Sequence, residues 1–266
     1  MKKRVLSAIA IVIIFVPLML IGGITFTAFM TILAAAGIYE LIKVREKSKK
    51  FPRVVKVFAY LITVLLMVQN YNQNVFTYMV DYRSTAILIF AFLLPLLFVN
   101  KKEDTYNIND ALYMVGSSIF IGLSFSLILL IRNYDLNYLI YILLITTMTD
   151  VFAYLTGYYI GEHKLCPTIS PKKTIEGCII GVLVGTFIGS MFYLSLIGSI
   201  SVLKIIFMSL ILTILSEMGD LVFSAIKRYY DKKDYSNIIP GHGGILDRFD
   251  SVIFVSLGMS LLLSIL

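Results

Sequence analysis

The sequence contains no tryptophan, two histidines and two cysteines. The cysteines, Cys166 and Cys178, allow at most one disulfide, and no other feature indicates one. A closed zinc site would need acidic ligands in addition, so we interpret His163 and Cys166 as ordinary loop residues. Without tryptophan, an aromatic belt at a membrane interface must come from the 17 tyrosines.

Charged side chains are also scarce. They make up 15% of the chain, whereas soluble domains have about 25% charged residues. Hydrophobic residues make up 59%, whereas soluble domains have about 45–50%. The mean hydropathy is +0.89, so the sequence predicts an integral membrane protein. The net charge of +7 is typical of cytoplasmic loops rich in Lys and Arg, and no nucleic-acid partner is expected.

A helix that crosses a bilayer needs about 20 mostly apolar residues. We therefore expect an all-α integral membrane protein, a polytopic bundle of about nine transmembrane helices. The predicted segments are 5–22, 23–42, 54–70, 84–100, 111–131, 137–160, 177–200, 202–228 and 245–266. The cations at 2–4 resemble the start of a signal peptide, but no small-residue cleavage site follows. We expect the first segment to remain as an anchor.

The distribution of Lys and Arg predicts the orientation. With a cytoplasmic N-terminus, 20 cations lie in inside segments, and only Arg83, Arg132 and Lys204 lie outside. This asymmetry predicts a multi-pass protein of the cell (plasma) membrane, with its N-terminus inside and its C-terminus outside. Residues 220–250 then face the cytoplasm.

The loop from Lys43 to Lys56 carries seven cations and one acid, Glu46. Contact with anionic lipid headgroups is one interpretation, and ordinary topological charge is the favoured one. Glu40, at the inner end of the second predicted span, is expected to snorkel to the surface or to pair with Lys43.

Asp150 lies inside the predicted span 137–160. A carboxylate there costs about 2.5–3.5 kcal/mol on insertion, so it is expected to face a wet cavity or a cation. A structural hydrogen bond to a neighbouring helix is the alternative.

The next loop contains Ser170, Pro171, Lys172 and Lys173. Serine before proline predicts a helix N-terminus with proline in its first turn. The N–H groups of that turn and the two lysines would form a phosphate cradle. Glycines then recur at every fourth position, which indicates close helix packing, either inside the bundle or between subunits. They are Gly177, Gly181, Gly185 and Gly189.

Polar residues gather most densely at 217–250. Five of them recur three or four residues apart and therefore share one helix face. They are Glu217, Asp220, Ser224, Lys227 and Arg228. This face passes from acids at membrane depth to bases at the cytoplasmic mouth, as a metal-bound polyphosphate would require.

A glycine-rich turn, Pro240-Gly241-His242-Gly243-Gly244, leads to Asp247, Arg248 and Asp250. Glycines let the backbone approach a ligand closely. Because Mg²⁺ takes hard oxygen ligands, often one or two carboxylates with substrate phosphates, Asp220 and Asp247 are the predicted metal ligands. Salt bridges from the acids to Arg228 or Arg248 are the alternative.

The run from Ser224 to Asp250, with Lys227-Arg228, Lys233-Asp234 and the glycine-rich turn, resembles the signature of phosphatidate cytidylyltransferases (CDP-diacylglycerol synthases). Segments 150–157 and 170–177 resemble further parts of that family, and residues 1–100 match only in hydropathy. The resemblance implies transfer of CMP from CTP to phosphatidate, giving CDP-diacylglycerol and diphosphate in phospholipid biosynthesis. It also implies dependence on Mg²⁺, with a second cation such as K⁺ nearby, and a homodimer.

The resemblance also assigns roles to residues. The expected catalytic residues are Asp220, Ser224, Asp247 and Asp250, with Asp220 and Asp247 as the metal ligands. The expected substrate-binding residues are Asp150, Lys173, Lys227, Arg228, Lys233, His242, Gly243, Gly244 and Arg248. Family members often have an acid just before this serine, where Phe223 stands here. Whether Glu217, one turn earlier, takes that role is left open.

We expect residues 1–100 to form a transmembrane scaffold and residues 101–266 to form the catalytic region. Two rival functions remain. A CTP-dependent lipid kinase would transfer the γ-phosphoryl group instead of CMP. A secondary transporter would use Asp150, Glu217 and Asp220 as an ion path, but the two halves show no repeated pattern, which is frequent in transporters.

Overall fold

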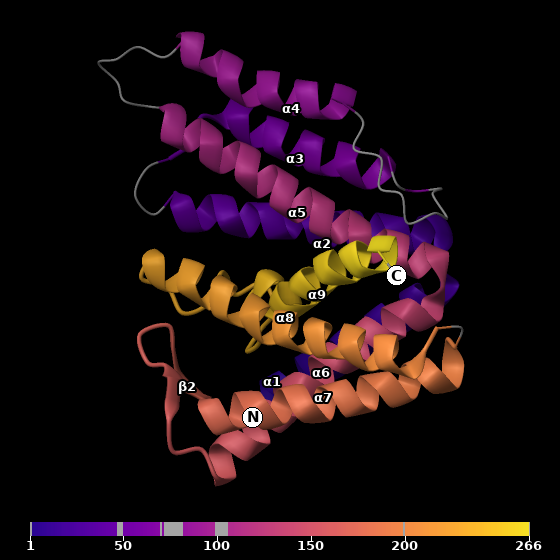
Figure 1. Ribbon diagram of the computed structural model, residues 1–266. Helices are drawn as coiled ribbons and strands as arrows, with labels where there is room; N and C mark the ends of the chain where they lie inside the picture. The colour runs from indigo at the N-terminus through magenta and orange to yellow at the C-terminus, as the bar shows by residue number, and fades with distance from the viewer. Residues whose placement is uncertain are drawn as a thin grey trace. The chain divides into compact units, whose positions relative to one another are not determined.

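The computed structural model describes residues 2–46, 50–69, 71, 82–98, 106–198 and 200–265 (Figure 1). Each of the predicted apolar segments contains a helix. The helices are α1 (Lys2–Ile21), α2 (Gly23–Arg45), α3 (Arg53–Gln69), α4 (Tyr82–Leu93), α5 (Ile108–Tyr134), α6 (Leu136–Tyr159), α7 (Ile175–Leu196), α8 (Val202–Tyr229) and α9 (Leu246–Ile265). A 3₁₀ turn, η1 (Leu94–Phe98), and two short strands, β1 (Lys164–Cys166) and β2 (Ser170–Thr174), complete the set.

Five of these helices are long and apolar enough to cross a membrane, within the part of the chain that the structure describes. They are α2, α5, α6, α7 and α8. The protein is thus a multi-pass membrane protein, and the crossing of all nine segments stays a prediction. The predicted span 84–100 changes at Leu94 from α-helix to the 3₁₀ turn that contains Pro95, because proline lacks the N–H that continues a helix.

Some predicted features fall outside the described residues. These are the ends of three predicted spans, at Asn70, at 99–100 and at Leu266, residue 199 of a fourth span, and four cations of the orientation argument. The four cations are Lys47, Lys49, Lys101 and Lys102.

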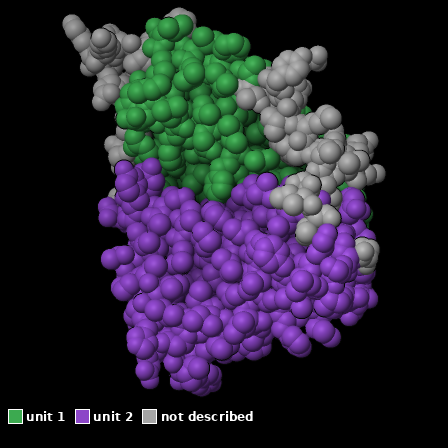
Figure 2. Space-filling model, in the orientation of Figure 1, with its two compact units in different colours: residues 1–133, 234–247 green, residues 134–233, 248–266 purple. Residues whose placement is uncertain are grey.

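The chain divides into two compact units, which Figure 2 shows in two colours. Unit 1 comprises residues 1–133 and 234–247, and unit 2 comprises residues 134–233 and 248–266. The units are described separately below. The expected division into a scaffold and a catalytic region stays a prediction.

Unit 1 has an apolar core made by α2, α3, α4 and α5, which Figure 1 shows as neighbouring helices. Ile38, Ala59, Phe92 and Met114, one from each helix, are fully buried in it. Polar groups at its edge are paired, since Arg45 bonds the buried Asp110 at 2.9 Å. A charge without such a partner would be costly at this depth.

Unit 2 is built on α6, α7 and α8, which pack against one another. The glycines of α7 lie on its contact face. A Cβ at Gly181 would stand 2.8 Å from the backbone oxygen of Thr149 and 2.8 Å from Cβ of Ala153, both on α6. The prediction of close packing is therefore confirmed. The packing partner is α6 of the same chain, a choice that the sequence left open.

The prediction that a helix begins at Ser170 is wrong. Residues 170–174 form β2, which pairs with β1 as an antiparallel hairpin. The residue before a proline avoids helical backbone angles, which favours an extended chain at Ser170. Helix α7 begins only at Ile175, where the Thr174 hydroxyl accepts a hydrogen bond of 3.2 Å from the N–H of Gly177. This hairpin is also the one departure from an all-α fold among the described residues.

Candidate functional site

A cavity of about 700 Å³ lies within unit 2. It is lined by α6, the β1–β2 hairpin, the start of α7 and the middle of α8. Asp150, Lys173, Glu217 and Asp220 all contribute to its wall. Asp150 is exposed and interacts electrostatically with the other three. The prediction that Asp150 faces a cavity and a cation is therefore confirmed.

Lys173 holds two of these acids together. Its Nζ lies 2.6 Å from Oε2 of Glu217 and 2.8 Å from Oδ2 of Asp220. Burial alone would lower the pKa of Lys173, but the carboxylates of Asp220 and Glu217 outweigh it and hold the pKa above its usual range. Lys173 is thus a fixed positive charge. The alternative prediction named Arg228 or Arg248 as the salt-bridge partner of the acids, whereas the salt bridges of Glu217 and Asp220 seen here are to Lys173.

Glu217 is the most buried acid of this group, with 3% of its surface exposed. Its Oε2 pairs with Lys173, whereas its Oε1 is buried and has no hydrogen-bond partner among the described residues. An unsatisfied buried oxygen is costly. This carboxylate can therefore accept one further donor or cation.

The polar stripe predicted on α8 is confirmed. The hydroxyl of Ser224 donates to Oδ1 of Asp220 at 3.3 Å, one turn away. Lys227 is buried, and Arg228 is exposed. Arg228 donates to two backbone oxygens, those of Ile169 in the hairpin and Lys232 in the following loop. It therefore anchors the hairpin to the end of α8.

Helix α9 approaches α8 closely in unit 2. A Cβ at Gly219 would lie 2.8 Å from the backbone oxygen of Asp250, and Asp250 interacts electrostatically with Asp220 and Lys227. Phe223, which stands where the related family often has an acid, is fully buried. Its ring packs edge-on against Phe254 at 6.3 Å. This position therefore serves helix packing.

The glycine-rich turn belongs to unit 1. The Ile239 N–H donates to the oxygen of Gly243 at 2.9 Å, and the His242 N–H donates to the oxygen of Ile239 at 3.0 Å. Gly241 and Gly243 have φ values of 79° and 88°. Other residues rarely adopt such angles, so the turn requires glycine at both positions.

Asp247 fixes the exit of this turn. Its Oδ2 accepts hydrogen bonds from the N–H of Gly244 at 2.8 Å and from the N–H of Tyr235 at 2.9 Å. The side chain therefore holds together both ends of the polar loop that precedes α9.

Glu40 of α2 holds the same turn from the other side, and both predictions for it are wrong. It neither snorkels nor pairs with Lys43, because it is fully buried. Its carboxylate accepts hydrogen bonds from the Ser236 hydroxyl at 2.6 Å and from the N–H groups of Ile245 and Leu246, both at 2.8 Å. The available signal was a single acid inside an apolar run, which at membrane depth indicates a specific partner.

A second residue of the N-terminal half also contacts the turn. The Ser7 hydroxyl of α1 lies 2.7 Å from Nδ1 of His242 and 3.0 Å from the backbone oxygen of Pro240. No feature of the sequence around Ser7 distinguishes it from other serines in apolar helices.

The structure thus groups the predicted site residues in two sets. Unit 2 contains a set around the cavity and α8, and unit 1 contains a set around the glycine-rich turn. The first set comprises Asp150, Lys173, Asp220, Ser224, Lys227, Arg228, Arg248 and Asp250. The second comprises His242, Gly243, Gly244 and Asp247. Lys233 is exposed in the loop after α8. The pairing of Asp220 with Asp247 around a metal stays a prediction.

The chain is similar to known proteins over nearly its whole length. Residues 2–266 match the profile of the Cytidylyltransferase family. A phosphatidate cytidylyltransferase of Bacillus subtilis is 33% identical over 259 residues, which cover 96% of this chain and 94% of that protein. Those of Staphylococcus haemolyticus and Staphylococcus aureus are each 33% identical over 255 residues, which cover 96% of both chains.

Proposed function

The chain belongs to the Cytidylyltransferase family, and on this premise we propose that it transfers CMP from CTP to phosphatidate. The products are CDP-diacylglycerol and diphosphate, and the reaction belongs to phospholipid biosynthesis. The names of the related bacterial proteins support this substrate pair. The observation that carries the proposal is the polar cavity of unit 2, in which Lys173 bridges Glu217 and Asp220.

The reaction joins two anions. A phosphate oxygen of phosphatidate attacks the α-phosphorus of CTP, and the bond from that phosphorus to the oxygen of the β-phosphate breaks. The electron pair leaves with diphosphate. The phosphate is already a competent nucleophile, so the site needs no strong base. It must position the two substrates and neutralise their charge.

Cations of the chain supply part of that neutralisation. Lys173 stays charged in its acidic surroundings, and Lys227 and Arg228 end the polar face of α8. We assign these three to the phosphates of the substrates, together with Lys233 and His242. The glycines of the turn, Gly243 and Gly244, would let the backbone approach the nucleotide.

The acids of the site fit a divalent cation. Glu217 has a buried oxygen without a partner among the described residues, and the half-buried Asp220 lines the cavity. The described residues contain no group of three or more His, Cys, Asp or Glu side chains that could hold a metal by themselves. Mg²⁺ usually completes its shell with water and phosphate oxygens, so one or two carboxylates suffice. Asp220 and Asp247 would hold Mg²⁺, with a second cation such as K⁺ nearby, and Ser224 and Asp250 would be neighbours of that centre. When bound, the metal would neutralise phosphate charge.

The lipid would reach the cavity from the bilayer. Tyr154 and Tyr158, on the wall of the cavity, are 68% and 73% exposed, and amphipathic aromatic rings suit the headgroup region of a membrane. We further propose that the protein is a homodimer of the plasma membrane, with the site open to cytoplasmic CTP.

The reaction is tested with purified protein, phosphatidate and Mg²⁺, using CTP labelled in the cytidine or in the γ-phosphate. Cytidine label in the lipid, with release of diphosphate, is the expected result, and EDTA should abolish it. A γ-phosphate label in the lipid would instead establish the lipid kinase. No label in any lipid, together with ion flux into proteoliposomes, would establish the transporter.

A further inference from the structure

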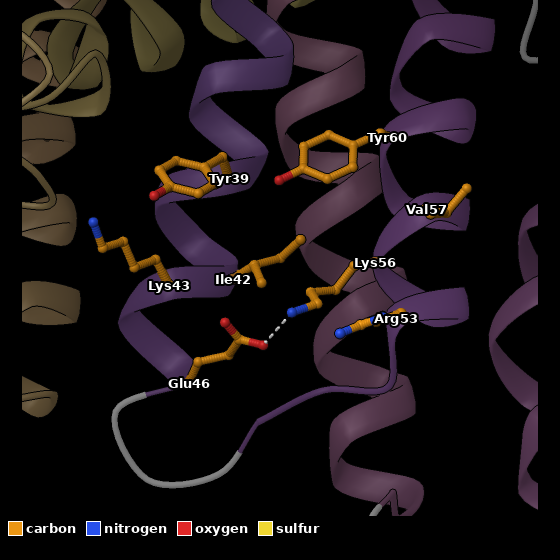
Figure 3. A pocket seen from close by; sticks show the side chains of 8 residues that line it. All are labelled: Tyr39, Ile42, Lys43, Glu46, Arg53, Lys56, Val57 and Tyr60. Carbon is orange, nitrogen blue, oxygen red and sulfur yellow. Dashed lines mark hydrogen bonds and ion pairs between the residues drawn. The ribbon is translucent and has the colours of Figure 1, made fainter.

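A second pocket lies in unit 1, and none of the residues that line it has an assigned role in the reaction. It is formed by the end of α2 and the beginning of α3, and its volume is about 320 Å³ (Figure 3). Figure 3 shows two different ends. Tyr39 and Tyr60 form one end, and Glu46, Arg53 and Lys56 form the other, next to the α2–α3 loop. Lys43 extends along the side of Tyr39.

The pocket is lined by more cations than acids. Lys43, Arg53 and Lys56 line it together with one acid, Glu46. Lys56 pairs with this acid at 2.9 Å, whereas neither Lys43 nor Arg53 has an ion pair within the described part of the chain. The Lys43 ammonium lies 5.3 Å from the centre of the Tyr39 ring. Two positive charges are therefore available to an anion.

An exposed apolar stripe continues from the pocket along α3. Val57, which lines the pocket, is 53% exposed, and Leu61 and Val68 on the same helix are each 57% exposed. Their spacing of four and seven residues places them on one face of the helix. The pocket thus combines cations with an exposed apolar stripe on the same helix pair.

We propose that this pocket binds an anionic phospholipid of the surrounding bilayer. Its phosphate would meet Arg53 and Lys43, and an acyl chain would lie along the stripe of α3. A guanidinium matches a phosphate with two parallel hydrogen bonds, and an ammonium adds a point charge. A free phosphate would use only the cations. The pairing of two uncompensated cations with an exposed apolar face therefore favours a lipid over a soluble anion.

Binding is tested without CTP, so the outcome does not depend on the proposed reaction. The full chain is purified in detergent and titrated with phosphatidylglycerol, and retained lipid is counted by native mass spectrometry. The variant is Arg53→Gln. The matched control is Lys50→Gln, which removes an exposed cation of the same loop that does not line the pocket.

A general surface cation contributes about fivefold to the binding of anionic lipid. We expect Arg53→Gln to weaken retention at least about tenfold more than Lys50→Gln does, and Arg53→Lys to restore part of the loss. Thermal unfolding of each variant shows whether the fold is kept. If Arg53→Gln does not fold, Lys43→Gln is compared with Lys50→Gln in its place.

Four results would overturn the proposal. Equal losses of lipid retention in Arg53→Gln and Lys50→Gln would mean that the cations of this loop act only as ordinary topological charge. Equal retention of phosphatidylcholine would remove the role of charge. Displacement of the lipid by glycerol phosphate would identify a site for a soluble anion, and retention of phosphatidate without phosphatidylglycerol would identify a site for the substrate.

Discussion

The carboxylate of Glu40 accepts a hydrogen bond of 2.6 Å from the hydroxyl of Ser236, although 196 residues separate the two along the chain. The same carboxylate accepts the N–H groups of Ile245 and Leu246, which flank the start of α9. These three donors satisfy the oxygens of a buried carboxylate, which would otherwise lack hydrogen-bond partners. The apolar N-terminal half thus supplies a specific support for the glycine-rich turn.

This support predicts a large effect of Glu40→Ala. The change leaves two buried N–H groups without an acceptor, each at a cost of about 1–3 kcal/mol. We expect a lower unfolding temperature and faster hydrogen exchange at Ile245 and Leu246. Glu46→Gln is the control, since this partly exposed acid forms a surface ion pair worth about 0–1 kcal/mol. Equal shifts in the two variants would contradict the role of Glu40.

Asp220→Asn and Asp247→Asn should each reduce nucleotide transfer at least about 100-fold, because each removes a charge assigned to the metal. Asparagine keeps an oxygen, so Asp247→Asn can still accept the N–H of Gly244. Asp247→Asn should therefore insert and unfold like the parent protein, and Asp220→Asn should insert although it loses the ion pair with Lys173. The measurement is CDP-diacylglycerol formed per purified protein, with Glu162→Gln, an exposed acid, as the control. Turnover near that of the parent protein in either variant would refute the metal assignment.

Lys173→Met should destabilise the protein by about 3–5 kcal/mol, because it leaves the buried Glu217 and the half-buried Asp220 without their cation. The control is the exposed neighbour Lys172→Met. The raised pKa of Lys173 adds a pH dependence. Stability from a raised lysine pKa is fully present below the unfolded value of about 10.4 and is lost only as the pH rises through the folded value.

The difference in stability between the parent protein and Lys173→Met should therefore stay constant from about pH 6 to about pH 9. Chemical unfolding in detergent at several pH values measures it. A difference that disappears within this range would mean that Lys173 is not held as a cation.

Replacing glycine by alanine should have opposite effects on stability at a packed glycine of α7 and at an open glycine of α5. Gly181→Ala places a methyl group against the backbone of α6 and should cost about 1–3 kcal/mol through overpacking. Gly116→Ala, on α5, meets nothing within 4 Å and should stabilise its helix by about 0.5–1 kcal/mol. Thermal unfolding of both variants tests this. Stabilisation by Gly181→Ala would mean that α6 and α7 are farther apart.

The predicted orientation can be tested with single cysteines in a chain whose two native cysteines are replaced by serine. Thr168→Cys lies at the exposed tip of the hairpin, and Lys204→Cys lies at the exposed start of α8. We expect a membrane-impermeant maleimide to label the second in intact cells and the first only after the membrane is opened. The reverse pattern would place the cavity outside the cytoplasm.

The helices, the membrane class and the family signature can all be predicted from the sequence. Long apolar runs must satisfy their backbone groups internally, so each of them predicts a helix whatever its neighbours are. The glycine face of α7 and the polar stripe of α8 could also be predicted, because helical spacing alone places such residues on one face. The signature at 224–250 was readable because its residues are contiguous.

Which charged side chains contact one another depends on the packing of the folded chain. Lys173 reaches Glu217 and Asp220 because the chain from Ser170 forms a strand instead of a helix. Glu40 faces the glycine-rich turn instead of the surface. Both outcomes depend on contacts between segments distant in sequence. A buried charge takes whichever partner the packed helices bring within hydrogen-bonding distance, and no local pattern records that choice.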